Sequence, residues 1–196
     1  MQKIPSLFKR DFEGNPHYVT REIDPVCQWV IDGEGKATRK WNGTACMIKS
    51  GLLYKRYDAK NGKTPPNGFI PAQEPDPITN HWPGWLLVCE IPEDKWHRAA
   101  LENASDTKQE LKDGTYELLG PKIQGNSEKM LVHVLEPHGV TILEDAPRTF
   151  DSLKKYLQHK EIEGIVWHHE DGRMAKIKKS DFDYTVKREE TPVVEQ

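Results

Sequence analysis

The chain has 196 residues, about the length of one globular domain. Its 28 basic and 31 acidic residues give a formal net charge of −3, so nucleic acid could be bound only through a local basic face. The start lacks the apolar core of a signal peptide, no stretch is long enough to cross a bilayer, and three cysteines without metal-type spacing argue against a disulfide framework. We therefore expect a cytoplasmic protein without membrane contact and without an obligate protein partner.

Apolar periodicity and turn residues predict a mixture of strands and helices. Strands are expected around residues 26–32, 36–49, 51–57, 84–91, 115–119, 130–136, 163–169 and 173–179. Helices are expected at 94–104 and at 149–160, where Phe150, Leu153 and Leu157 share one face. The Pro-rich segment 64–83 contains apolar anchors and is predicted to be a long structured loop or lid. We interpret residues 1–186 as one α+β domain and the charged tail 187–196 as disordered.

The first segment that could carry chemistry is the turn Lys40-Trp41-Asn42-Gly43. Asn-Gly allows a tight turn, so this run taken alone is more typical of an ordinary hairpin preceded by an exposed lysine. A lysine can attack phosphorus only as the free amine, which burial or neighbouring cations would favour.

Two downstream segments could supply such cations. Residues 173–178 alternate basic and apolar side chains, so a strand would place Lys176 and Lys178 on one face. Residues 163–167 form the other half of a predicted hairpin and bring Glu163 near the two ammonium groups. Taken alone, the pattern also fits a solvated strand edge with a simple salt bridge. Together with Lys40, it is typical of a covalent nucleotidyltransferase with a lysine nucleophile and two phosphate-binding lysines.

The ordered motifs resemble those of the ATP-dependent RNA ligases of the covalent nucleotidyltransferase superfamily. Lys40-Trp41-Asn42-Gly43 is similar to the family's Lys-x-Asp-Gly motif, and residues 163–166 and 176–178 are similar to its Glu-Gly-x-Val and Lys-x-Lys strands. Residues 116–124 resemble the central Glu-Leu-x-Gly-Pro motif, the part most specific to RNA ligases. The resemblance covers roughly residues 26–180. It implies an α+β nucleotidyltransferase (ATP-grasp-like ligase) domain of two antiparallel sheets flanked by helices around a nucleotide cleft.

The resemblance also implies the roles of single residues. Lys40 would form lysyl-AMP, while Lys176 and Lys178 would hold the α-phosphate. Glu163 would position magnesium through water, and Glu117 would hold a ribose hydroxyl or the same metal water.

Two further contacts with the nucleotide or RNA are implied in the same way. Arg56 would contact ribose or the RNA end. His133 falls where the family places an aromatic residue that stacks on adenine, although a histidine within an apolar strand is also typical of a half-buried structural residue.

Two positions depart from the family pattern. Asn42 replaces the usual Asp and removes a carboxylate that helps to orient metal-bound water. Arg39 stands where many relatives carry an acidic residue, which would leave the adenine contact there to backbone atoms.

The reaction that the resemblance implies is ATP- and Mg²⁺-dependent joining of RNA 5′-phosphate and 3′-hydroxyl ends, with Mn²⁺ as an alternative metal. The alternatives are a guanylyltransferase or a DNA-end adenylyltransferase that uses the same lysine, or a catalytically silent RNA-binding module. Little chain follows Lys178, which favours a minimal form without an OB barrel. A local basic face for RNA could come from Lys49, Lys55, Arg56, Lys60 and Lys63, and stacking from Trp41, Trp82, Trp85, Trp96 and Trp167.

Overall fold

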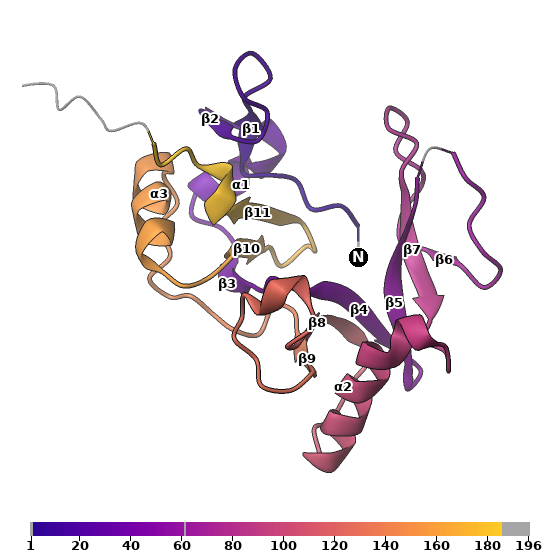
Figure 1. The fold of residues 1–196 in the computed structure, drawn as a ribbon. Coiled ribbons are helices and arrows are strands. Elements are labelled where there is room, and N and C mark those ends of the chain that lie inside the picture. The colour runs from indigo at the N-terminus through magenta and orange to yellow at the C-terminus, as the bar shows by residue number, and fades with distance from the viewer. Residues whose placement is uncertain (1, 61, 186–196) are drawn as a thin grey trace, which may run out of the picture.

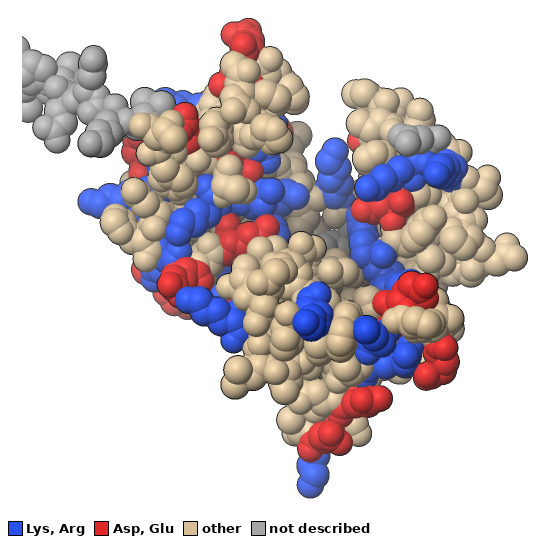
Figure 2. Space-filling model, viewed as in Figure 1, with Lys and Arg blue, Asp and Glu red and all other residues tan. Residues whose placement is uncertain are grey.

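The computed structural model describes residues 2–60 and 62–185. In this part of the chain, strands pair antiparallel in a large sheet, a small sheet and a two-stranded ribbon, and a few helices pack against them. The large and the small sheet lie in two lobes with a hollow between them (Figures 1 and 2). The α+β prediction is confirmed, with one more sheet than expected.

The large sheet has six strands in the order β6-β7-β5-β4-β8-β9. They are β4 (Thr44–Lys49), β5 (Leu52–Ala59), β6 (Ile70–Pro71), β7 (Trp82–Leu87), β8 (Gly114–Leu119) and β9 (Val134–Pro137). The small sheet has the order β11-β10-β3, from β3 (Lys36–Lys40), β10 (Gly164–His168) and β11 (Met174–Lys178). The ribbon pairs β1 (Phe8–Arg10) with β2 (Val19–Ile23).

The helices are α1 (Gln28–Ile31), α2 (Lys95–Asp106) and α3 (Phe150–His159). Short 3-10 helices lie at Pro25–Cys27, Pro92–Asp94, Gln124–Asn126 and Lys179–Asp181. Bilayer crossing takes about 20 apolar residues, and no helix in the described ranges combines such a length with sufficient apolarity.

Each main sheet buries one face in a core of its own. In the large sheet, Cys46, Leu118 and Leu135 pack with Ala100 of α2. In the small sheet, Ile165, Trp167 and Ile177 pack with the leucines of α3. Since side chains alternate along a strand, the opposite faces of both sheets remain available to line the hollow.

The predicted strand at 26–32 is wrong, because this segment is helical. Asp24 accepts a hydrogen bond from the backbone N–H of Val26, and Pro25 occupies the first helical position. Both are signals of a helix start that outweigh the apolar run in this short segment.

Two other strand predictions need correction. The continuous strand at 36–49 is divided into β3 and β4, which belong to different sheets, so residues 41–43 connect the two lobes. The strand at 130–136 contracts to β9, because the Asn126 side chain bonds both the N–H and the carbonyl of Met130 and holds that segment in a loop.

The remaining elements agree with the sequence patterns more closely. The hairpin β10–β11 is confirmed, and so is the buried face of α3, in which Leu153 and Leu157 are fully buried. The Pro-rich segment contains β6 and is anchored by Phe69 against Trp82. The tail 187–196 lies outside the described residues.

Candidate active site

The small sheet places three lysines on one face. Gly164 of β10 is paired with Lys40 of β3 on one side and with Lys178 of β11 on the other. Lys176 is paired with Val166, two residues further along the same strand. Paired residues share a face, so all three lysines project from the side opposite the α3 core.

Glycine at position 164 is required by close packing between strands. A Cβ built on Gly164 would lie 2.2 Å from the carbonyl oxygen of Ile177 and 2.8 Å from the Cα of Lys178. Both contacts are with backbone atoms, which cannot move aside without disturbing the β10–β11 ladder. The Gly of the motif thus permits the approach of the strand that carries Lys176 and Lys178.

Lys40 is held by the carboxylate of Glu163. Lys40 Nζ lies 2.5 Å from Glu163 Oε2, and the two side chains are 23% and 21% exposed. Burial raises the pKa of Glu163, against the opposing effect of the Lys40 charge. The pair therefore brings a lysine amine into contact with a carboxyl group that is a better proton acceptor than an exposed glutamate.

Lys176 lies in an environment that disfavours its charged form. Burial, followed by the nearby charges of Lys40 and Lys178, lowers the pKa of Lys176. Concentrated, partly buried positive charge of this kind is stabilised when an anion binds.

The turn after Lys40 is held by two carboxylates. Glu128 accepts hydrogen bonds from the backbone N–H of Asn42 at 2.9 Å and from Arg39 Nη2 at 2.5 Å. The guanidinium of Arg39 also covers the Trp41 ring at 3.9 Å. These contacts connect both flanks of Lys40 to the loop that follows β8.

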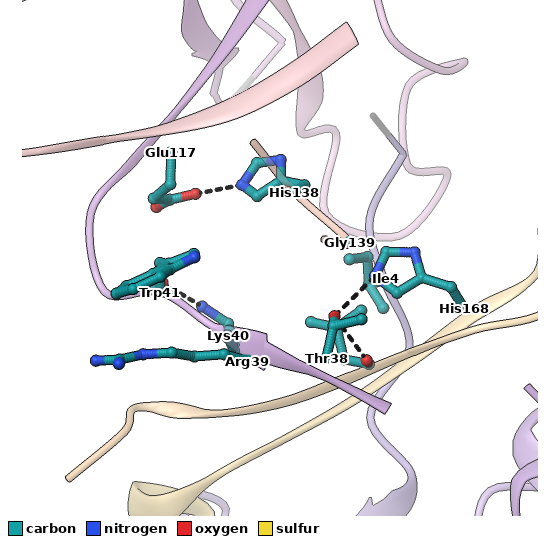
Figure 3. A pocket seen from close by; sticks show the side chains of 10 residues that line it. Ile4, Thr38, Arg39, Lys40, Trp41, Glu117, His138, Gly139 and His168 are labelled. Atoms are coloured by element: carbon teal, nitrogen blue, oxygen red, sulfur yellow. Dashed lines mark hydrogen bonds and ion pairs between the residues drawn. The ribbon is translucent and has the colours of Figure 1, made fainter. Parts of the chain in front are cut away.

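The second carboxylate belongs to Glu117, on β8 of the large sheet. Its Oε1 accepts the N–H of Gly43 at 3.1 Å, and its Oε2 lies 2.7 Å from His138 Nε2. Glu117 thus reaches across from the large sheet to the turn that joins the two lobes, and Figure 3 shows it facing His138 above Trp41 and Lys40.

A pocket lies at this junction between the sheets (Figure 3). It is lined by Ile4, Thr38, Arg39, Lys40, Trp41, Glu117, His138, Gly139, Val166 and His168. A second pocket is lined in part by Asn42, Glu128 and Glu163, and it shares Arg39 with the first. The lysine with the nucleophile-like motif is therefore accessible from a cleft.

The structure brings five of the seven residues singled out in the sequence into one neighbourhood. They are Lys40, Glu117, Glu163, Lys176 and Lys178, which are connected by the contacts above and by charge effects on Glu163 and Lys176. Arg56 lies further along the large sheet, where it bonds Asp58 and lies over Trp85. Lys55 and Tyr116 both pair with Cys46, and side chains alternate along a strand, so Arg56 lies on the same face of the large sheet as Glu117.

His133 lies away from the two pockets described above. It is not among the residues that line either pocket, and its ring stacks on Trp96 at 4.5 Å. It is 9% exposed, and burial lowers its pKa. A Cβ at Gly120 would collide with this ring, so Gly120 makes room for it.

Several pocket residues were not singled out from the sequence. Thr38 and His168 bond each other across the small sheet at 3.1 Å, and His138 reaches Glu117 from the end of β9. Ile4 arrives from the start of the chain. Thr38 could have been found from its place two residues before Lys40 on a strand, but the others depend on long-range pairing.

The basic and aromatic residues that the sequence suggested for RNA binding do not form one continuous surface in the structure. Lys55 and Arg56 point to opposite faces of β5, and Lys55 pairs with the buried Asp94 at the start of α2. Trp85 and Trp167 are buried. Figure 2 shows Lys and Arg side chains on both sides of the hollow between the lobes.

The fold is that of an α+β protein with two main antiparallel sheets. In its site, lysines of the small sheet lie close to carboxylates at the turn that connects the small sheet to the large sheet. A model of the RNA ligase 1 family matches residues 87–195, more than half of the chain. The chain therefore belongs to the RNA ligase 1 family. The matched range includes Glu117, Glu163, Lys176 and Lys178, whereas Lys40 and Arg56 precede it.

Individual relatives carry the same family name. The chain is 28% identical to RNA ligase 1 of Rattus norvegicus over 210 aligned residues, which cover 81% of this chain and 65% of the rat protein. It is 29% identical to RNA ligase 1 of Mus musculus, with 81% and 64% covered, and 36% identical to that of Danio rerio over 110 residues, with 51% and 33% covered. The chain thus spans slightly less than two thirds of the length of the rodent relatives.

Proposed function

We propose that this chain is an ATP-dependent RNA ligase built on a covalent nucleotidyltransferase domain, and that it joins RNA 5′-phosphate and 3′-hydroxyl ends. The observation that carries the proposal is the convergence of Lys40, Lys176 and Lys178 on one face of the small sheet, with Glu163 in contact with Lys40. Membership of the RNA ligase 1 family supports RNA as the substrate.

The first step is attack of Lys40 Nζ on the α-phosphorus of ATP. A bond forms between nitrogen and phosphorus, the bond from phosphorus to the bridging oxygen breaks, and pyrophosphate leaves. The ammonium proton must be lost, and on this proposal Glu163 accepts it, which is supported by its hydrogen bond to Nζ and by the burial that raises its pKa. Lys176 and Lys178 hold the α-phosphate oxygens and stabilise the charge that develops on them.

The next two steps transfer AMP and seal the RNA. An oxygen of the RNA 5′-phosphate attacks the AMP phosphorus and releases the Lys40 amine, which regains a proton. The 3′-hydroxyl oxygen then attacks the 5′-phosphorus, loses its proton and displaces AMP. On this proposal Glu117 binds a ribose hydroxyl of AMP, and Arg56 contacts ribose or the RNA end.

The carboxylates present are compatible with a divalent metal that binds mainly to phosphate. Within residues 2–60 and 62–185 there is no group of three or more His, Cys, Asp or Glu side chains that could hold a metal on its own. Mg²⁺ needs only one or two carboxylates when phosphate oxygens and water complete its shell. The charge of Glu117 raises the pKa of Glu163, so the two carboxylates act on each other electrostatically. On this proposal they would hold Mg²⁺ or Mn²⁺, and the metal would neutralise phosphate charge.

The test is the intact mass of the protein after incubation with ATP and magnesium, followed by peptide mapping. We expect one AMP adduct on Lys40, labile to acid, and none in Lys40→Ala. The matched control is Lys49→Ala, which removes an exposed lysine of β4. An adduct of equal yield in Lys40→Ala would remove the central claim.

The same assay separates the alternatives. An adduct formed from GTP in place of ATP would indicate a guanylyltransferase. Efficient joining of DNA ends would indicate a DNA-adenylating enzyme. The absence of an adduct with every nucleotide would indicate an RNA-binding module without catalytic activity.

A further inference from the structure

The segment Gln2–Leu7, here called the N-terminal strap, is bonded at one end to β11, the edge strand of the small sheet. The N–H of Lys176 donates to the carbonyl of Pro5 at 2.9 Å, and the N–H of Leu7 donates to the carbonyl of Lys176 at 2.8 Å. These bonds form a parallel bridge between Ser6 and Lys176. Leu7 is fully buried in the small-sheet core, so this end of the strap is firmly anchored beside a lysine of the site.

The other end of the strap is held by the Pro-rich segment of the large-sheet lobe. The backbone N–H of Lys3 donates to Gln73 Oε1 at 2.7 Å, and Lys3 Nζ lies 3.7 Å from Asp76. The Gln73 carbonyl in turn accepts a bond from Trp82 Nε1, at the start of β7. The strap therefore connects the small sheet to the Pro-rich segment. In Figure 1 the start of the chain runs into the space between the two lobes.

Ile4 lies between these two anchors and lines the pocket that contains Lys40. Figure 3 shows it beside Thr38, Gly139 and His168, away from the Lys40 amine. Thr38 precedes Lys40 by two residues on β3, which is about 7 Å along a strand. If the α-phosphate of a nucleotide lies at the Lys40 amine, the space left for its base is the rest of this pocket, where Ile4 supplies an apolar surface.

We propose that the N-terminal strap is one wall of the nucleotide site and that Ile4 packs against the purine base. This inference rests on the proposed function, because it takes the ligand of the pocket to be ATP. The flat face of a purine is apolar, and an aliphatic side chain held at both ends of its segment contacts it without the entropy cost of ordering a loop.

The test is the rate of AMP-adduct formation as a function of ATP concentration in wild type, Ile4→Ala, Gln73→Ala and Ile78→Ala. Ile4→Ala removes the side chain that makes the wall contact. Gln73→Ala keeps the Ile4 side chain but removes the hydrogen bond that ties the strap to the Pro-rich segment. Ile78→Ala is the matched control, since Ile78 is 88% exposed in the same Pro-rich segment. Melting temperatures confirm that each variant is folded.

We expect Ile4→Ala to raise the half-saturating ATP concentration about tenfold, the effect of losing a partly buried aliphatic contact. The maximal rate stays near wild type, because Ile4 carries no group that takes part in the chemistry. Gln73→Ala gives a smaller increase of about threefold, and Ile78→Ala none. A lower melting temperature without a change in half-saturation would reveal a purely structural strap and overturn the inference.

The outcomes for the two proposals are distinguishable. If wild type forms no adduct with any nucleotide, the proposed function fails and the inference about ATP fails with it. If wild type forms the adduct and a folded Ile4→Ala has unchanged half-saturation, only the inference about the strap is overturned.

Discussion

Lys40 and Lys178 flank the same residue, Gly164, in the two ladders of the small sheet. Neighbouring strands are about 4.8 Å apart, so the two lysines start about 10 Å from each other on one face. This separation leaves room for a phosphate group between their side chains. It also explains why three short motifs, far apart in the chain, could act as one site.

Gly164→Ala should damage both the sheet and the site. Its Cβ would clash with the backbone of Ile177 and Lys178, so we expect a loss of at least ~2 kcal/mol in the free energy of unfolding, as for other overpacked positions. Denaturant titration provides the measurement. Gly51→Ala is the comparison, since Gly51 has positive φ but open space and should cost only about 1 kcal/mol. Equal losses in the two variants would contradict the packing argument.

Glu163→Gln and Lys178→Ala should each reduce the rate of AMP-adduct formation by at least ~10²-fold, the effect of removing one preorganised charge contact. Gln keeps the size of Glu163 but neither pairs with the Lys40 charge nor accepts its proton. The measurement is a single-turnover rate at saturating ATP, with melting temperatures to exclude unfolding. Folded variants with rates near wild type would place the site elsewhere.

Glu128→Ala should slow adduct formation about tenfold through the geometry of the turn. Glu128 binds the N–H of Asn42 and the guanidinium of Arg39, so its loss frees both flanks of Lys40. Glu128→Gln keeps an acceptor for Asn42 and should recover part of the rate. The neighbouring Ser127→Ala, which removes only the bond to the Asn42 side chain, serves as the control. A Glu128→Ala enzyme as fast as this control would contradict the role assigned to Glu128.

Lys176→Met should stabilise the protein while it impairs adduct formation. The lowered pKa of Lys176 means that folding disfavours its charged form, mainly through burial. The unfolded chain then binds more protons than the folded one between the lowered pKa and the ordinary value of 10.5, so the penalty is full below this window and fades as pH rises through it. Denaturant titrations of both proteins at neutral and alkaline pH should show a stability gain in the variant that shrinks at high pH. A gain independent of pH would indicate a packing effect.

RNA ends should be joined in preference to DNA ends, because the 2′-hydroxyl distinguishes the two, and activity should fall as salt rises. The substrates for this test carry 5′-phosphate and 3′-hydroxyl ends in single-stranded, nicked and hairpin-borne form, as RNA and as DNA, at two salt concentrations. Equal or better joining of all-DNA substrates would support the DNA-adenylating alternative.

The local sequence was sufficient to predict the parts of the site that repeat with the period of a strand. Lys176 and Lys178 had to share a face because they are two residues apart, and the turn Glu170–Gly172 closed their hairpin onto β10. The buried face of α3 followed from its helical spacing in the same way. Such patterns are determined within a few residues by backbone geometry, and they do not depend on what the segment packs against.

The relation between the lobes was decided only by the tertiary structure. No local pattern shows that β3 and β4 part at Trp41 into two sheets, that Glu117 bonds the resulting turn, or that His138 and Ile4 reach the pocket from distant segments. His133 illustrates the same limit, since its aromatic partner Trp96 lies on α2. These contacts arise when separate faces are buried together, and their energy comes from surfaces far apart in the chain. The sequence by itself therefore determined which residues could carry the chemistry, and the packing of the two sheets determined which of them meet.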